Sequence, residues 1–271
     1  MRAPASAKIN LALVVGPLRP GGKHELLTVY QRVGLADRID LEPAAQLRVE
    51  GFEGDTLVRD ALERLAARAA TGRSWRVRIE KGIPVAAGLG GGSSDAATAL
   101  RLANETLDEP LSREHLHDLA AELGADVPFF LADGPCLGSG DGTTLRPLEL
   151  PQDYWVALVL PNDARKTSTA SVYAAFDERD GDAGWVERRD AVLDALQRVR
   201  RPRDLAALPP NDLASSPVAD ELRAAGAFRA DVSGAGPAVY GLFHQRQSAR
   251  AARRALGRLG QVWVTAPAWY G

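Results

Sequence analysis

A glycine-rich stretch in the first half of the chain most constrains what this protein can be. Residues 84–97 read PVAAGLGGGSSDAA, with four glycines in five positions, then two serines, an aspartate and an alanine-rich run that favours a helix. Glycine adopts backbone angles closed to other residues and lets a ligand approach the main chain. At the start of a helix such a loop gathers several N–H groups and the positive end of the helix dipole around one point. The stretch therefore predicts a phosphate site.

The stretch differs from two common nucleotide-binding loops. It does not end in Gly-Lys-Ser/Thr, as a P-loop does. A dinucleotide-binding loop has an acidic residue about 20 positions further on, and Asp95 lies too close to fill that role. A glycine-rich turn without a ligand is the alternative interpretation. Ser93 and Ser94 favour phosphate binding, because their hydroxyls can contact a phosphate or a bound Mg²⁺.

Composition places the chain among ordinary soluble globular proteins. Its 271 residues fit one large or two small domains, and 45% are hydrophobic and 25% charged. The net charge of −2 gives no electrostatic case for a nucleic-acid or membrane partner. Cys136 is the single cysteine, which excludes an internal disulfide and fits a reducing compartment. Without an apolar run of membrane-spanning length or a signal-peptide pattern at the start, we expect a cytoplasmic protein.

Lysine is rare in this chain, because almost all basic residues are arginine. The four lysines are Lys8, Lys23, Lys81 and Lys166. A lysine supplies a compact, flexible ammonium group that arginine cannot imitate. Each of the four lies in or beside a stretch with other functional features, although chance placement is the alternative for any one of them.

The hydrophobic pattern predicts short strands before the first helix and a regular alternation of elements after residue 151. Strands over 5–15, 23–33 and 37–41 indicate an antiparallel or mixed sheet. The later alternation indicates a second α+β layer structure. The other expected strands cover 75–79, a hairpin over 135–146, 154–160, 228–232, 239–243 and 262–266. The expected helices cover 55–70, the end of the glycine stretch to about 107, 112–123, 186–199, 218–225 and 248–259, and residues 166–176 are expected to be a loop that leads into a helix.

Four further positions carry chemistry. Lys8 and Asn10 are two apart on a strand and share one face, which is either a functional polar face or simply an exposed one. His24 is either a surface histidine or a ligand contact. Asp126 is an ionisable group among Gly, Ala, Val, Pro and Phe, and it also suits a helix N-cap with Pro128 in the first turn. A phosphate loop, a lysine and a carboxylate together indicate an ATP-dependent small-molecule kinase.

The motifs resemble those of the GHMP kinases. Residues 84–95 resemble the central phosphate motif of that family, and residues 7–11 (AKINL) and 232–237 (VSGAGP) resemble its first and third motifs. The three occur in the family's order and span nearly the whole chain. The resemblance implies an α+β two-domain architecture, with a ribosomal protein S5 domain 2-like N-terminal domain over 1–150, a ferredoxin-like C-terminal domain over 151–271, and the site between them.

Within this family the chain is most similar to the kinases that phosphorylate the 2-hydroxyl of a diphosphocytidyl-linked methylerythritol, in non-mevalonate isoprenoid (terpenoid) precursor synthesis. The similarity rests on residues 22–25 (GKHE), 124–128 (GADVP) and 211–213 (NDL). Another GHMP kinase, of the homoserine or mevalonate type, is the nearest alternative. A catalytically silent nucleotide-binding protein is a more distant one, and the presence of both Lys8 and Asp126 argues against it.

The resemblance also implies roles for individual residues. Lys8 and Asp126 match the catalytic pair, ATP is the co-substrate, Mg²⁺ is expected, and Ser94 and Asp126 are candidate metal ligands. The small molecules are the only expected partners of a monomer or weak homodimer. The residues that match the ATP site are Lys81, Pro84, Val85, Ala86, Ala87, Gly88, Leu89, Gly90, Gly91, Gly92, Ser93 and Ser94; those that match the substrate site are Asn10, Lys23, His24, Thr169 and Tyr173.

The chain departs from the family pattern at three places. Lys23 stands where the family has a tyrosine that stacks on the cytosine, a loss worth about 1–3 kcal/mol by analogy with base stacking. Lys23 can instead lie over the base or meet the diphosphate. Residues 55–57 read Asp-Thr-Leu in place of Glu-Asn-Leu, which weakens an expected adenine contact. Ala235 replaces a serine of the third motif, a change without expected consequence.

Overall fold

The computed structural model describes residues 1–54, 57–164 and 168–268. These residues form two compact units that alternate along the chain. The first unit contains Met1–Ala7, Leu35–Val85 and Gly90–Asp133, and the second contains Lys8–Gly34, Ala86–Leu89 and Gly134–Gly271. The predicted domain boundary at residue 150 is a different division and stays a prediction.

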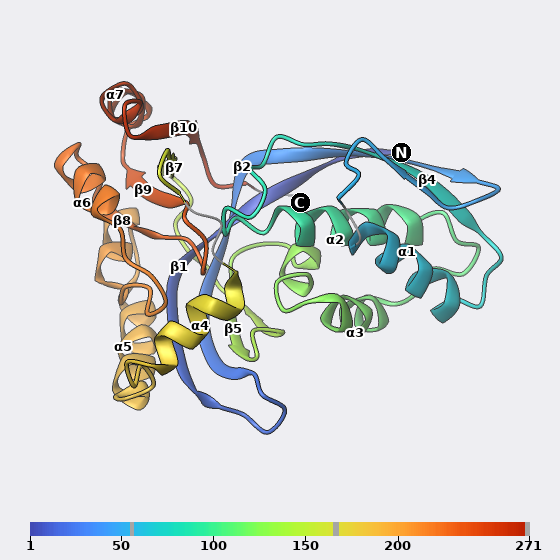
Figure 1. The fold of residues 1–271 in the computed structure, drawn as a ribbon, viewed down its shortest axis with the longest axis horizontal. Helices are drawn as coiled ribbons and strands as arrows, with labels where there is room; N and C mark the ends of the chain where they lie inside the picture. The colour runs from blue at the N-terminus through green and yellow to red at the C-terminus, as the bar shows by residue number, and fades with distance from the viewer. Residues whose placement is uncertain (55–56, 165–167, 269–271) are drawn as a thin grey trace. The chain divides into compact units, whose positions relative to one another are not determined.

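Two long strands, β1 (Arg2–Leu18) and β2 (His24–Ala44), pair with each other, and each contributes residues to both units (Figure 1). The prediction of two short strands over 23–33 and 37–41 was wrong, because β2 continues through Gly34. A Cβ atom at Gly34 would lie 2.8 Å from Oγ1 of Thr265. Close packing, not a turn, therefore accounts for this glycine.

In the first unit, three helices lie on one side of a small sheet (Figure 1). Strand β4 (Ser74–Glu80) pairs antiparallel with residues 38–44 of β2 and parallel with β3 (Arg48–Glu50). Trp75, Val77 and Ile79 alternate along β4 and are buried against the helices. The helices are α1 (Leu57–Arg68), α2 (Gly91–Asn104) and α3 (Arg113–Leu123), followed by the 3₁₀ helix η1 (Pro128–Leu131).

The second unit contains a four-stranded antiparallel sheet in the order β10-β7-β9-β8. Its strands are β7 (Trp155–Pro161), β8 (Arg229–Val232), β9 (Val239–Phe243) and β10 (Gly260–Thr265). Helices α6 (Pro217–Ala224) and α7 (Arg246–Leu256) bury their apolar faces against it. Numbered along the chain, the sheet order is fourth, first, third, second, which is the ferredoxin-like arrangement. The predicted fold of this part is confirmed.

The rest of the second unit includes the second part of β1, from Lys8, and the first part of β2, to Gly34. Residues 26–30 of β2 pair with β5 (Cys136–Gly140), which forms the predicted hairpin with β6 (Thr144–Pro147). Between β7 and α6 the chain forms α4 (Thr169–Asp177), α5 (Trp185–Arg198) and the 3₁₀ helix η2 (Pro202–Ala207). Strand β3 and η2 were not predicted, because three strand residues and a 3₁₀ turn leave no periodic pattern. No helix in the described ranges is long and apolar enough to cross a membrane.

Candidate active site

The glycine-rich loop leads directly into a helix, as the sequence predicts. Helix α2 begins at Gly91, and Gly90 before it is left-handed, with φ of 70°. Ala86 and Gly88 also have positive φ values, of 56° and 79°. A turn that contains left-handed residues can point successive N–H groups to the same side, which makes an anion-binding concavity.

Three successive carbonyl groups hold this loop in place. Those of Ala87, Gly88 and Leu89 accept hydrogen bonds from Ala238 N (3.1 Å), Ser233 Oγ (3.0 Å) and Lys8 N (2.9 Å) respectively. In a planar trans peptide, the N–H of the next residue points away from the carbonyl. The N–H groups that follow these three carbonyls therefore point away from the hydrogen-bond donors that those carbonyls contact.

Gly88 is packed against the third glycine-rich motif. A Cβ atom at Gly88 would lie 2.4 Å from the carbonyl oxygen of Ser233 and 2.6 Å from Cα of Gly236. A Cβ atom at Gly236 would lie 2.2 Å from the backbone nitrogen of Gly88. Two motifs that are separated by more than 140 positions therefore meet backbone to backbone, and neither position accepts a side chain.

Lys8 and Asn10 share one face of β1, as predicted, and that face is buried. Nζ of Lys8 donates to Oδ1 of Asn10 (2.7 Å), and Nδ2 of Asn10 donates to Oγ1 of Thr28 (2.7 Å). Thr28 in turn donates to the carbonyl of Ala12 (2.8 Å). Lys8 and Asn10 are only 4% and 3% exposed, so the alternative of an exposed strand face is wrong. The chain of hydrogen bonds fixes the position of the ammonium group.

Lys81, at the entry to the glycine loop, binds two buried carboxylates. Its Nζ donates to Oδ2 of Asp37 and to Oδ2 of Asp95 (2.8 Å). Oδ1 of Asp37 also accepts the N–H groups of Gly82 (2.6 Å) and Ile83 (2.8 Å). Burial and the Asp37 carboxylate raise the pKa of Asp95 to about 8, against the effect of Lys81. The cluster ties the strand before the loop to the helix after it.

The end of the loop carries the two serines. Ser94 is buried in the first turn of α2, whereas Ser93 is half-buried. Val85, in the loop itself, is 59% exposed, which is unusual for a large apolar side chain in this protein. An exposed valine in this loop can offer apolar surface to a bound ligand.

Asp126 is half-buried in the turn that precedes η1. The prediction that it caps a helix was wrong, because Val127 is the residue at the N-cap of η1 and no side chain caps that helix. Val127 instead donates its N–H to the carbonyl of Gly124 (3.1 Å), which closes the turn. Helix α2, which carries Ser94, packs against η1 within the first unit. Asp126 and Ser94 therefore come from neighbouring elements.

His24, at the start of β2, is 8% exposed, so the surface alternative is wrong. Its Nδ1 lies 2.7 Å from the carbonyl oxygen of Gly16, and its Nε2 lies 3.2 Å from Oδ1 of Asp177. The imidazole stacks on the ring of Tyr173, with 5.2 Å between the ring centroids. It contacts Phe176 edge-on, with 5.7 Å between the centroids. The structure thus brings two of the predicted substrate residues together.

Lys23 forms an ion pair with Asp141. Its Nζ donates to Oδ2 of Asp141 (2.7 Å), in the turn between β5 and β6. Partial burial acts to raise the pKa of Asp141, but Lys23 and Thr143 outweigh it and hold the pKa at about 2. Thr169 is exposed at the first position of α4. Lys166 lies outside the described residues, as do Asp55 and Thr56 of the expected adenine contact.

Sequence reasoning missed the partners that hold these residues. Asp37 is 44 positions from Lys81, and Ser233 is 145 positions from Gly88. Thr28 and Asp177 were missed for the same reason, because nothing local marks them. Asp95 lies inside the glycine motif, and an acidic residue in an apolar helix face was the one signal that could have been followed.

Comparison with known proteins agrees with these motifs. The sequence model described as the GHMP kinases N terminal domain matches residues 56–134, and the one described as GHMP kinases C terminal matches residues 205–261. A protein of Nocardia farcinica named 4-diphosphocytidyl-2-C-methyl-D-erythritol kinase is 40% identical over 258 residues, which are 88% of this chain and 82% of that protein.

The chain belongs to the GHMP kinase family. Among solved structures, that of a 4-(cytidine 5′-diphospho)-2C-methyl-D-erythritol kinase covers 100% of both chains with a TM-score of 0.81 and 33% identity. The mevalonate kinase of Methanococcus jannaschii covers 100% of this chain and 98% of its own, with a TM-score of 0.76 and 13% identity. The likeness to the mevalonate kinase shows the two-domain fold of this GHMP kinase. The likeness to the diphosphocytidyl-methylerythritol kinase includes the amino-acid sequence as well as the fold.

Proposed function

We propose that this GHMP kinase transfers the γ-phosphoryl group of ATP to the 2-hydroxyl of 4-diphosphocytidyl-2-C-methyl-D-erythritol, a step of non-mevalonate isoprenoid synthesis. The likeness over nearly the whole chain to kinases of that name carries the proposal. The buried His24 beside Tyr173 supports it, because a mevalonate- or homoserine-type substrate has no base for an imidazole and a phenol ring to contact.

In the proposed reaction the loop over 84–94 binds the nucleotide phosphates through its N–H groups and the two serines. Asp126 accepts the proton of the attacking hydroxyl, and Lys8 neutralises charge that develops on the transferred group. Phosphoryl transfer needs alignment and charge compensation more than covalent catalysis. The hydrogen bond from Lys8 to Asn10 and the anchored loop carbonyls supply such alignment in advance.

Mg²⁺ fits this arrangement as an ion held mainly by phosphates. No group of three or more acidic, histidine or cysteine side chains that could hold a metal occurs among the described residues. Mg²⁺ commonly takes one or two protein ligands together with substrate phosphates and water. Ser94 and Asp126, on the neighbouring elements α2 and η1, are the proposed ligands. When bound, Mg²⁺ would offset the negative charge of the phosphates.

We propose that His24 reads the base through Nε2. The carbonyl of Gly16 can only accept, so Nδ1 of His24 carries the hydrogen in this contact. Nε2 then faces outward toward Asp177, whose side chain is 48% exposed. A cytosine edge can replace that carboxylate. Lys23, already paired with Asp141, is proposed to contribute charge near the substrate instead of base stacking.

The remaining proposals concern the environment of the enzyme. We propose a cytoplasmic monomer or weak homodimer that has neither a nucleic-acid nor a membrane partner. The net charge of −2 and the single cysteine support this view.

A panel of acceptors tests the proposed substrate. ADP formation is measured with 4-diphosphocytidyl-2-C-methyl-D-erythritol, its diphosphouridyl counterpart, mevalonate and homoserine. We expect turnover with the cytidine compound. For its uridine counterpart, kcat/KM should be lower by about 10-fold or more, because a buried hydrogen-bond partner is lost.

The variant His24→Ala provides the matched control. It should raise KM for the cytidine compound and abolish the preference for cytidine over uridine, with KM for ATP unchanged. Turnover of mevalonate or homoserine at a higher rate than the cytidine compound would contradict the proposal and favour the alternative GHMP kinases. Binding of ATP without turnover of any acceptor would favour a silent nucleotide-binding protein.

A further inference from the structure

Asn211 is a buried side chain that the proposed reaction does not use. It lies in the segment between η2 and α6 and is 8% exposed. Its Nδ2 donates to the carbonyl oxygens of Gly234 (2.7 Å) and Val232 (3.1 Å), and its Oδ1 accepts the N–H of Leu213 (2.8 Å). Both hydrogens of the amide are therefore bound to the third glycine-rich motif, and its oxygen is bound to its own segment.

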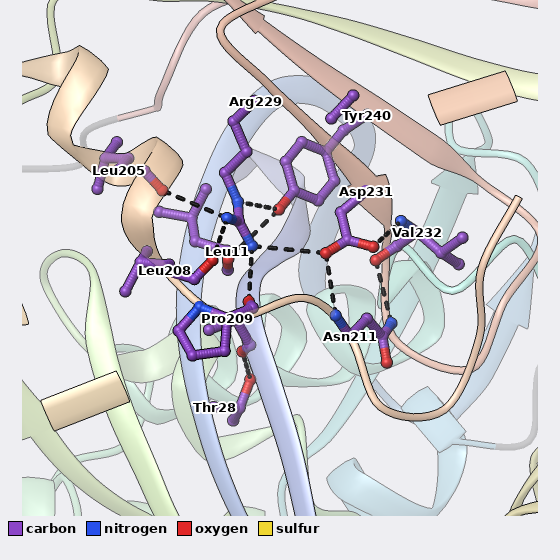
Figure 2. Close-up of polar contacts among 12 residues, drawn as sticks. Leu11, Thr28, Leu205, Leu208, Pro209, Asn211, Arg229, Asp231, Val232 and Tyr240 are labelled. Atoms are coloured by element: carbon purple, nitrogen blue, oxygen red, sulfur yellow. Dashed lines mark hydrogen bonds and ion pairs between the residues drawn. The ribbon is translucent and has the colours of Figure 1, made fainter. Parts of the chain in front are cut away.

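A second set of contacts fixes the backbone of Asn211 (Figure 2). Its N–H donates to Oδ2 of Asp231 (3.0 Å), and Oδ1 of the same carboxylate accepts the N–H of Val232 (2.8 Å). Asp231 also lies 3.4 Å from Nη2 of Arg229, and both residues are buried. The carboxylate thus links the start of the motif to the segment that carries Asn211.

Arg229 anchors this segment from the other side. Its guanidinium donates to the carbonyls of Leu208 (2.6 Å), Pro209 (2.9 Å) and Leu205 (3.3 Å), as Figure 2 shows. Its Nε donates to the hydroxyl of Tyr240 (3.0 Å), which reaches the carbonyl of Leu11 on β1 at 3.4 Å. A buried arginine with so many carbonyl partners gives the segment little freedom to shift.

The clamped turn lies directly against the residues at the centre of the proposed chemistry. Gly234 is left-handed, with φ of 60°, and a Cβ atom there would lie 3.1 Å from Nζ of Lys8 and 3.3 Å from Oδ1 of Asn10. A change in the position of Gly234 therefore changes the space around the Lys8 ammonium.

We propose that Asn211 is a positioning residue, which holds the Gly234 turn against Lys8 so that the ammonium keeps the position in which it acts. The inference rests on the proposed function of Lys8. Only a side chain that both donates twice and accepts once satisfies all three groups, and asparagine does so at this length. Aspartate has the same shape, but its carboxylate cannot donate to the two carbonyls and faces them with negative charge.

The test compares Asn211→Asp with Asn104→Asp. Asn104 is 7% exposed, and its amide bridges the carbonyl (3.1 Å) and N–H (2.8 Å) of Leu111, at the far end of α2 from the glycine loop. Both variants should lower Tm. Only N211D should lower kcat, by at least about tenfold, because a misplacement of about 1 Å near the reacting groups can cost a hundredfold. N104D should keep the kcat of the wild type.

Two further readouts separate positioning from general destabilisation. The ratio of N211D activity to wild-type activity should rise as pH falls, because a protonated carboxyl regains one donor. Hydrogen exchange of residues 232–238, measured by mass spectrometry without substrate, should become faster in N211D and stay unchanged in N104D. If N211D does not fold, Asn211→Ala is measured in the same way, since it removes the donors without adding charge.

The outcomes are distinct for the two proposals. Equal kcat losses in N211D and N104D, or unchanged exchange over 232–238, would overturn the positioning role. A wild-type enzyme that does not use the diphosphocytidyl substrate would instead refute the proposed function. The exchange measurement still tests the clamp in that case, because it needs no substrate.

Discussion

At the scale of single residues, the buried cluster of Asp37, Lys81 and Asp95 has a definite charge state. Two ionised carboxylates and one ammonium would leave a net negative charge on a largely buried cluster. A proton on Asp95 removes this net charge. This agrees with the pKa of Asp95, which is raised to about 8. Asp37 accepts two backbone N–H groups in addition to Lys81, so the proton that this cluster needs is assigned to Asp95.

This assignment predicts opposite results for two similar substitutions. Asp95→Asn replaces a neutral acid by a neutral amide and should change stability little at neutral pH. Asp37→Asn removes the carboxylate that binds both Lys81 and two backbone N–H groups. It should cost about 3–5 kcal/mol, the usual loss when one member of a buried ion pair is removed. Urea unfolding at pH 7 measures both, and equal losses would contradict the assignment.

The same cluster predicts how stability changes with pH. Folded Asp95 keeps its proton between about pH 4 and pH 8, whereas unfolded Asp95 has released it. The folded state therefore binds more protons, and this residue makes the protein less stable as pH rises through that range. D95N lacks this titration. The free energy of unfolding of D95N minus that of the wild type should therefore increase from pH 5 to pH 8. A constant difference between the two proteins would show that Asp95 is ionised throughout.

Residue patterns within one element were predictable, and partners across the chain were not. Positions 8 and 10 share a strand face whatever surrounds them, so the contact between Lys8 and Asn10 followed from their spacing. The charge state of Asp95 depends on Asp37, which no local pattern connects to it. His24 was left open between the surface and the site, because burial of its ring depends on Tyr173 and Phe176, far along the chain.

At the scale of elements, the glycines of one loop have different reasons to be glycine. Gly88 is left-handed and has no room for a Cβ atom against Gly236 and Ser233. Gly92 is in the first turn of α2 and has nothing within 4 Å of its Cβ position. The sequence suggested phosphate binding for all of them, yet Gly88 is needed first for packing between two motifs.

This difference predicts opposite signs for Gly88→Ala and Gly92→Ala. G88A should lower Tm and disrupt the loop. G92A should raise the free energy of unfolding by up to about 1 kcal/mol, the gain of alanine over glycine in a helix. If a phosphate occupies the open space at Gly92, G92A should also raise KM for ATP. Thermal unfolding and ATP titration of both variants check this, and a stabilised G88A would contradict the described packing.

Elements were predicted well where periodicity was long, and poorly where tertiary contacts set the boundary. The amphipathic helices and the C-terminal strands follow their patterns closely. Strand β2 passes Gly34 without a break, because that glycine accommodates Thr265 from β10. The cap predicted at Asp126 failed because a turn closed by Gly124 and Val127 positions this carboxylate instead.

At the scale of the whole molecule, the order of three motifs was enough to predict the family, and the strand order confirms the ferredoxin-like part. The assembly of those motifs was beyond the sequence. The second unit combines residues from the start, middle and end of the chain, so that Lys8, Gly88 and Ser233 lie within one compact body. Such an arrangement requires long β1 and β2 strands that serve both units.

The most direct test of the account is ADP formation from Mg-ATP and 4-diphosphocytidyl-2-C-methyl-D-erythritol by the wild type and by Asp126→Asn, which keeps the shape of the side chain. The account predicts turnover by the wild type and a loss of about 10²–10⁴-fold in the variant, the usual contribution of a general base. ATP binding measured without Mg²⁺ should be similar in both. A wild type that binds ATP but leaves this acceptor unchanged, or a variant as active as the wild type, would contradict it.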